Sequence, residues 1–180
     1  MTRRKPERIA KWPWSVPLAI ADVPETGRHL DLAADDQTRA AIAKLAGLRA
    51  LPRLDAAFDV TLRGRDGLHV TGRVSATVGQ VCVVTLDPID NEIEEEIDLV
   101  FTPGAALANK GGVEGEDAPE ALVDGMVDLG AIATEFLLLA LDPHPRKPGA
   151  VFEAPPKGDE GAHPFAALAA LKKGQSRSGS

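Results

Sequence analysis

Residues 92–101 read Glu-Ile-Glu-Glu-Glu-Ile-Asp-Leu-Val-Phe, and their alternation is the clearest structural signal in the chain. Apolar residues alternate with acidic ones, which is the period of a strand that buries one face. The apolar members are Ile93, Ile97, Leu99 and Phe101. The acidic members are Glu92, Glu94, Glu96 and Asp98. The stretch therefore predicts a strand that is buried on one face and strongly anionic on the other.

The chain before this stretch keeps the same period of two. Apolar and polar residues alternate from Phe58 to Leu62, and residues 64–67, Gly-Arg-Asp-Gly, have the composition of a hairpin turn. The return strand is expected from Leu68 to Val78, with a β-bulge at Gly72. Together with residues 92–101, these strands predict an antiparallel meander.

Two segments with helical spacing are predicted to pack on this sheet. Asp35 or Asp36 can cap the first, which ends near Gly47, and Asp128 can cap the second, which Pro143 ends. Further strand candidates lie at 14–20, 29–32 and 121–127. The expected fold class is α+β: an antiparallel β-meander or partly closed barrel with two main helices packed on it and a short C-terminal helix.

Length and composition fit one domain with extended ends, since 180 residues that are 44% hydrophobic can bury a substantial core. We expect a flexible basic N-terminus at 1–14 and an α+β domain at 15–152 with an acidic, mobile loop at 103–119. A Pro/Gly-rich tail at 153–180 carries a short apolar helix at 164–172. This helix is too short to be stable alone, so it must dock somewhere. Its apolar residues are Phe165, Leu168 and Leu171.

The net charge of -7 predicts a soluble, acidic protein that repels bare nucleic acid on average. A single cysteine excludes an intramolecular disulfide, and the sequence shows neither a secretory signal nor a run of transmembrane length. We therefore expect a cytoplasmic protein without membrane contacts. Aromatic residues make up only 4%, which argues against stacking platforms for single-stranded nucleic acid.

The sequence contains no catalytic constellation that we can identify. The four histidines stand in unrelated contexts, and neither a nucleophile elbow nor a phosphate-binding loop is present. The acidic row lacks the enclosing loop of a calcium site, so we interpret it as a solvated face or as a surface for a basic partner. The Pro-rich residues 142–148 are either a rigid linker or a binding segment; the basic side chains are His144, Arg146 and Lys147. We expect no enzyme activity, no metal and no cofactor.

Three stretches of the chain resemble the YceD family, bacterial and plastid proteins named for large ribosomal RNA subunit accumulation. Residues 82–88, Cys-Val-Val-Thr-Leu-Asp-Pro, look like the family's C-x-x-C-L-x-P segment. Residues 127–145 are similar to its helix and Pro-rich exit, and residues 164–172 resemble its terminal P-F-x-x-L-x-x-L-K. The motif residues of the first stretch are Cys82, Thr85, Leu86 and Pro88.

The resemblance implies a non-enzymatic factor, an adaptor that supports synthesis, processing or stability of the large-subunit (23S) ribosomal RNA. Its partner would be ribosomal RNA or a basic ribosomal or processing protein, with the indirect role favoured. The contact surfaces would be the acidic row, the Pro-rich basic segment and the terminal helix. Two alternatives stay open: a metal- or thiol-dependent enzyme centred on Cys82 and the acidic strand, and a scaffold that folds around a partner through the terminal helix.

One position departs from the family pattern. Thr85 stands where many relatives have a second cysteine, so a pair of thiolate ligands is not expected here. We interpret the segment as a structural hinge in which Cys82 is a small buried apolar residue and Leu86 is also buried. Asp87 and Pro88 then turn the chain into the acidic strand.

Overall fold

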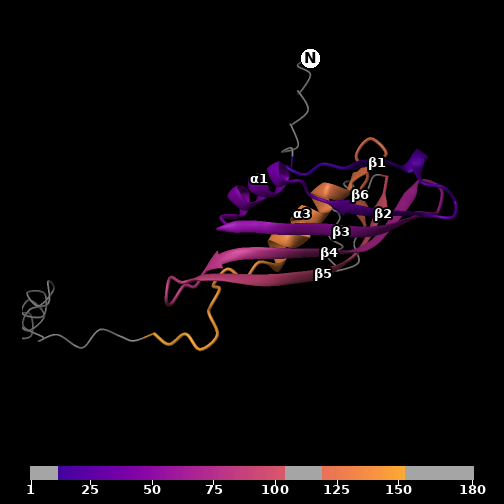
Figure 1. The fold of residues 1–180 in the computed structure, drawn as a ribbon. Coiled ribbons are helices and arrows are strands. Elements are labelled where there is room, and N and C mark those ends of the chain that lie inside the picture. Colours follow the sequence, from indigo (N-terminus) through magenta and orange to yellow (C-terminus); the bar gives the residue numbers. More distant parts are fainter. Residues whose placement is uncertain (1–11, 104–118, 153–180) are drawn as a thin grey trace, which may run out of the picture. The chain divides into compact units, whose positions relative to one another are not determined.

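The computed structural model describes residues 12–103 and 119–152 (Figure 1). The chain divides between Lys147 and Pro148 into two units. Every helix and strand that the structure describes lies in the first unit. Three features expected from the sequence lie wholly or mostly outside the described residues: the basic N-terminus, the loop at 103–119 and the C-terminal helix at 164–172.

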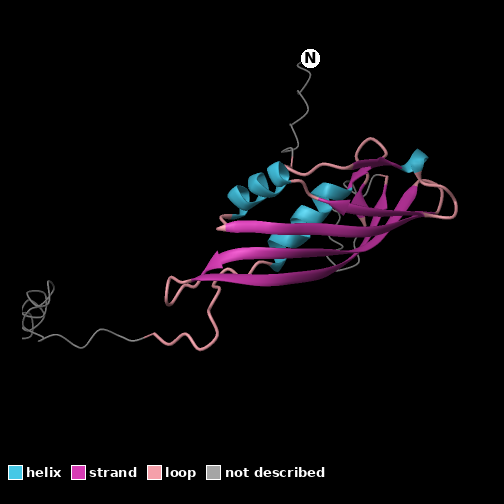
Figure 2. Cartoon of the chain, viewed as in Figure 1, coloured by secondary structure: helices cyan, strands magenta, loops and turns pink. Residues whose placement is uncertain are grey.

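A five-stranded sheet forms the centre of the first unit (Figures 1 and 2). Its strands, in spatial order, are β2 (Arg28–Ala33), β3 (Ala50–Arg63), β4 (Gly67–Val81), β5 (Pro88–Thr102) and β6 (Glu120–Ala121). Neighbours from β2 to β5 are antiparallel, which is the predicted meander. β6 adds parallel to β5 at Phe101 and Thr102, so the sheet is mixed. The α+β class is confirmed, whereas the described strands form an open sheet and not a barrel.

A second, two-stranded sheet pairs β1 (Pro17–Ala19) with β7 (Met126–Asp128). The strand predicted at 14–20 is shorter than expected because the chain turns into the 3-10 helix η1 (Ile20–Asp22). The strand predicted at 121–127 is divided between β6 and β7. Asp124 and Gly125 take positive φ angles of 53° and 72°, which places a turn between the two strands.

Two capped helices complete the unit. In α1 (Asp36–Ala46), the Asp35 carboxylate accepts the N–H of Thr38 at 2.7 Å, and Gly47 ends the helix with a φ of 66°. In α3 (Leu129–Ala140), the Asp128 carboxylate accepts the N–H of Ala131 at 3.1 Å. The predicted caps are therefore confirmed, with Asp35 as the first of them.

The core lies between these helices and one face of the sheet, which we call the inner face. Its fully buried strand residues include Leu54, Phe58, Val60, Val70 and Val74, and Ile42 and Leu129 come from the helices. The predicted bulge at Gly72 is wrong, since pairing runs without interruption through Phe58 opposite Gly72. A Cβ at Gly72 would come within 2.3 Å of the Ala57 carbonyl oxygen, so close packing around Phe58 requires glycine there.

Candidate functional site

The face of the sheet opposite the helices, which we call the outer face, is strongly acidic. It carries the predicted acidic row of β5, and all of these side chains are exposed: Glu92, Glu94, Glu96 and Asp98. β2 and β3 add further exposed or half-buried carboxylates: Asp31, Asp55 and Asp59. The basic side chains on this face include Arg53, Arg73, His29 and His69, and Arg63 lies on the same face at the end of β3. Acids therefore outnumber arginines, and the face has an excess of negative charge.

Basic side chains of β3 and β4 reach across to the acidic row. Arg53 Nη2 lies 2.8 Å from Glu92 Oε2, and Arg73 Nη1 lies 2.6 Å from Glu94 Oε1. His69 Nε2 lies 2.7 Å from Asp98 Oδ1. Because both members of each pair are solvent-exposed, one such pair stabilises the fold by about 0–1 kcal/mol. The acidic row was predicted from the sequence, but its basic partners were not.

Hydrogen bonds on the outer face also favour the charged forms of two groups. The Thr77 hydroxyl donates to Glu92 Oε1 at 2.8 Å, and this bond, together with Arg53, lowers the pKa of Glu92. The Asp59 carboxylate lies 2.8 Å from His29 Nδ1 and raises the pKa of His29. Glu92 thus keeps its negative charge to lower pH, while His29 keeps a proton to higher pH.

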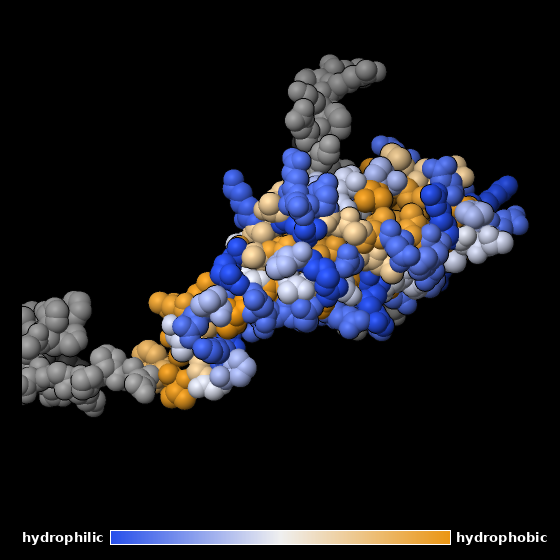
Figure 3. Space-filling model, in the orientation of Figure 1, coloured by the Kyte–Doolittle hydropathy of each residue, from blue (hydrophilic) through white to orange (hydrophobic). Residues whose placement is uncertain are grey.

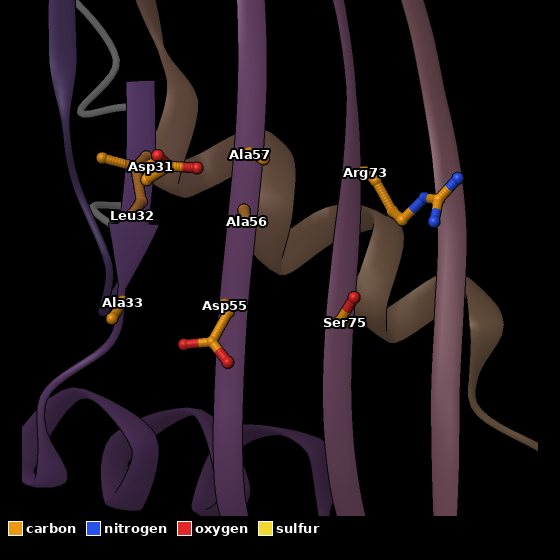
Figure 4. Close-up of a pocket in the computed structure, with 8 residues that line it drawn as sticks. All are labelled: Asp31, Leu32, Ala33, Asp55, Ala56, Ala57, Arg73 and Ser75. Carbon is orange, nitrogen blue, oxygen red and sulfur yellow. The ribbon is translucent and has the colours of Figure 1, made fainter. Parts of the chain in front are cut away.

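Small side chains leave two shallow hollows in the outer face on either side of Arg73. The first, of about 330 Å³, is lined by Asp31, Asp55, Ala57, Arg73 and Ser75 among others (Figure 4). The second, of about 390 Å³, includes Asp59, Thr71 and Glu96. Figure 4 shows Arg73 extending toward β5, away from Asp55. Carboxylates thus border hollows that are open to solvent and wide enough to receive a side chain of a partner.

The two predicted motif segments meet at Cys82, in a site that we call the Cys82 junction: the turn of residues 82–88 and the segment 142–147 bonded to it. The N–H of Val83 donates to the Pro145 carbonyl at 2.9 Å. Cys82 Sγ is buried and accepts the N–H of Thr85 at 3.4 Å and that of Lys147 at 3.3 Å. The Lys147 ammonium lies 3.1 Å from Asp87 Oδ2. The sequence suggested each segment separately and gave no sign that they touch.

These hydrogen bonds change the chemistry of the thiol. The N–H of Lys147, followed by the contacts from Thr85, lowers the pKa of Cys82 to about 6, although burial acts in the opposite direction. The sulfur is therefore a hydrogen-bond acceptor that favours the thiolate form. This corrects the interpretation of Cys82 as an apolar residue, while its predicted burial is confirmed.

The prediction that Leu86 is buried is wrong. Its side chain is 75% exposed, and its φ of 62° lies in the left-handed region. The turn is closed by two backbone bonds, from the N–H of Leu86 to the Cys82 carbonyl and from the N–H of Cys82 to the Asp87 carbonyl. Leu86 adopts this conformation in the closed turn, and its side chain faces solvent. Figure 3 shows hydrophobic surface at this end of the sheet.

Some of the remaining predicted site residues lie in the described part of the chain and the others lie outside it. His144 and Arg146 are exposed, whereas Lys147 belongs to the Cys82 junction, and Pro88 begins β5. Phe165, Leu168 and Leu171 lie outside the described residues. Within 12–103 and 119–152, the acidic and histidine side chains form no cluster of three or more that could hold a metal ion. No helix in this part of the chain is long and apolar enough to cross a membrane.

The chain is thus a small α+β protein with an open, acidic sheet face and a motif turn held by a buried cysteine. The family model described as large ribosomal RNA subunit accumulation protein YceD matches residues 70–172, and the chain belongs to this family. The predicted resemblance is confirmed. The match spans β4 to α3, and so includes the acidic row and the Cys82 junction, while β1 to β3 lie before it. No curated protein and no solved structure matches the chain.

Proposed function

We propose that the protein is a non-enzymatic factor that supports synthesis, processing or stability of the 23S ribosomal RNA by binding a basic protein of ribosome biogenesis. Membership of a family named for accumulation of the large ribosomal RNA supports the biological role. The excess of carboxylates on the outer face supports the kind of partner. This excess is the observation that carries the proposal.

The charge of the outer face favours protein over bare RNA. Phosphate backbones attract surfaces rich in lysine and arginine, whereas here Arg53 and Arg73 are paired with acids that outnumber the arginines. A basic ribosomal or processing protein meets complementary charge on the same surface, which accelerates association and excludes wrong partners. The hollows beside Arg73 give basic side chains places to enter.

The Pro-rich segment extends the proposed contact area. His144 and Arg146 are exposed next to residues fixed by the Cys82 junction, and Leu86 and Val83 present apolar surface there, 75% and 46% exposed. An exposed leucine in this turn is suited to anchor a partner, because two backbone hydrogen bonds already close the turn and little backbone freedom is lost on binding. The terminal Phe165, Leu168 and Leu171 are proposed to contribute as well.

Depletion of the protein in cells tests the biological role. We expect precursor 23S RNA to rise relative to mature 23S RNA, or total 23S RNA to fall, while 16S RNA changes less. A Glu96→Lys/Asp98→Lys variant should restore the RNA poorly, because it reverses charge on the outer face. Glu25→Lys/Asp22→Lys makes the same charge change on residues outside the sheet and should restore it fully. Unchanged 23S levels after depletion would sink the proposal.

Binding assays with purified full-length protein separate the protein partner from direct RNA binding. The chain is titrated with 23S fragments and with basic large-subunit proteins at two salt concentrations. We expect binding to the proteins that weakens as salt rises, and little binding to RNA at either concentration. Tighter binding to RNA than to every basic protein would replace our proposal with the direct one.

One observation favours a second candidate function, a thiol- or metal-dependent enzyme: the pKa of Cys82 is lowered to about 6, as in reactive cysteines. The sulfur is, however, buried and already occupied by two N–H donors. Elemental analysis of the purified protein and a Cys82→Ser variant test this candidate. Bound metal at one equivalent, or loss of a turnover activity with the fold intact, would support it; a metal-free and fully functional variant would remove it.

A further inference from the structure

The edge of the sheet at β5 is open along most of its length. β4 pairs with β5 from Pro88 to Phe101, but on the other side β6 reaches only Phe101 and Thr102. No other strand among residues 12–103 and 119–152 lies beside β5. Backbone groups between Ile89 and Val100 that point away from β4 therefore lack a strand partner in the described part of the chain. Such an edge is a template for another strand.

We propose that this edge binds an extended basic segment of another protein, which adds to the sheet as a further strand beside β5. The inference deepens the proposed function, on which it rests, by naming how the basic partner binds. Main-chain hydrogen bonds would supply part of the affinity, and alternate side chains would supply specificity.

Charge on the outer face selects the occupant. The basic side chains Arg73 and His69 contact the acidic row from the β4 side only, and the opposite side of the row faces the open edge. An added strand would place alternate side chains next to Glu92, Glu94 and Glu96, at the distances of cross-strand pairs, about 5 Å between Cβ atoms. Lysine or arginine at those alternate positions completes the charge pattern.

The inner face determines which residues the added strand carries between its basic positions. Ile93 and Leu99 are half-buried at the edge, while Glu95, between Ile93 and Ile97, is exposed and has no ion pair among the described residues. Apolar side chains of an added strand would cover Ile93 and Leu99, and a further basic or hydroxyl side chain would face Glu95. The expected ligand therefore alternates basic and apolar residues, a pattern that can be written as a peptide.

The same charges oppose pairing of two copies of this chain. If two β5 edges met, the carboxylates of both acidic rows would lie side by side, and like charges directly opposite one another are destabilising. Glu95 adds an inward-facing charge, a device that keeps edges from pairing with themselves. Residues 104–118 carry Glu114, Glu116 and Asp117 against a single lysine, so they do not supply the alternating basic residues either.

The test uses the full-length chain and a synthetic peptide in which lysine alternates with valine. Two control peptides are matched to it: one with the same residues in an order that breaks the alternation, and one methylated at alternate backbone nitrogens. We expect the alternating peptide to bind about tenfold more tightly than either control, because only it offers both the charge pattern and the main-chain donors.

Amide exchange gives a direct signature of strand addition. The peptide should slow exchange at every second amide of β5 between Ile89 and Val100, and leave the amides of β2 unchanged. Glu96→Lys reverses a carboxylate of the acidic row that an alternate lysine of the peptide would face, and it should weaken binding by about three- to tenfold. Glu25→Lys makes the same change in net charge away from β5 and should not weaken binding.

Four outcomes would overturn the inference. Equal binding of all three peptides would show attraction by charge alone, and RNA that protects the same amides would replace the protein ligand. Protection that appears without peptide and grows with protein concentration would show that a second copy occupies the edge. The fourth outcome is that the alternating peptide does not bind. Depletion of the protein would still change 23S RNA in that case, so failure of this inference is distinguishable from failure of the proposed function.

Discussion

The outer face and the Cys82 junction are built in opposite ways. On the outer face, exposed side chains of neighbouring strands pair across the sheet, as Arg73 does with Glu94. At the Cys82 junction, a buried sulfur accepts backbone N–H groups from two segments, and Lys147 is 65 positions away from Cys82 in sequence. Exposed ion pairs contribute little to stability, whereas a buried acceptor that is removed leaves donors unsatisfied. The difference implies that the junction maintains the shape of the protein and that the outer face is free to serve recognition.

The largest expected effect comes from removing the sulfur. Cys82→Ala leaves the N–H groups of Thr85 and Lys147 without their acceptor in a part-buried site, so the Tm should fall by roughly 5–10 °C. Cys82→Ser keeps a smaller acceptor and should lose less. Thermal unfolding followed by circular dichroism measures both. A Tm for the alanine variant equal to that of the wild type would mean that the junction does not hold the two segments.

The thiol should also make stability depend on pH. The pKa of Cys82 is lowered from about 9 to about 6 in the folded protein, so between these values the unfolded chain binds a proton that the folded chain does not. The contribution of the thiolate is therefore complete above pH 9 and is lost as the pH falls through 6. Urea unfolding should show the difference between wild type and Cys82→Ala growing from pH 6 to pH 9. A constant difference would contradict the assigned thiolate.

The comparison also explains what the sequence could predict. The acidic row and the helix caps follow from local rules, because strand alternation fixes which side chains share a face and Asp35 lies directly before its helix. The contact between Cys82 and Lys147 depends on where α3 ends relative to the turn, which no local pattern encodes. Leu86 was misjudged for a related reason: a hydrophobic residue predicts burial, but closure of the turn required a left-handed φ that directs it to solvent.

The basic side chains that pair with the acidic row are an intermediate case between features set by local rules and contacts set by the tertiary structure. Once β4 is paired with β5, the register places Arg73 opposite Glu96 and His69 opposite Val100. The period of β4 alone already puts both basic residues on the polar face, so the ion pairs were accessible from sequence with the correct register. The parallel pairing of β6 with β5 could not be predicted from the sequence. Residues 103–119 separate the two strands, and a connection of that length permits either a parallel or an antiparallel pairing.

A smaller effect is expected at the turn itself. Leu86→Gly removes a left-handed strain of about 1–2 kcal/mol, against about 0.5–1 kcal/mol for the greater freedom of glycine in the unfolded chain. The unfolding free energy should therefore stay the same or rise by up to about 1.5 kcal/mol in urea titrations. Leu86→Ala keeps the strain and serves as the control, with little change because the side chain is exposed. A loss of more than about 1 kcal/mol in Leu86→Gly would show that the side chain packs in the fold.

If both Leu86 variants are stable yet restore 23S RNA poorly in depleted cells, the leucine acts in binding. The junction would then combine the two roles that the comparison separates: a buried sulfur that holds the turn, and an exposed leucine that the turn presents. Full restoration by both variants would assign the turn to architecture alone.

The smallest effect on stability is expected at Arg73 on the outer face. Its guanidinium contacts Glu94 at 2.6 Å and Glu96 at 3.6 Å, but all three side chains are exposed, so Arg73→Gln should lower the unfolding free energy by about 0.5 kcal/mol or less. The same change makes the outer face more negative and should tighten binding of the alternating lysine–valine peptide, most clearly at low salt. Measured on one protein sample, the free energy of unfolding should thus fall slightly while the affinity for the peptide rises. A loss of stability comparable to that of Cys82→Ala would show that the outer face also maintains the fold, and the division of roles between the two regions would fail.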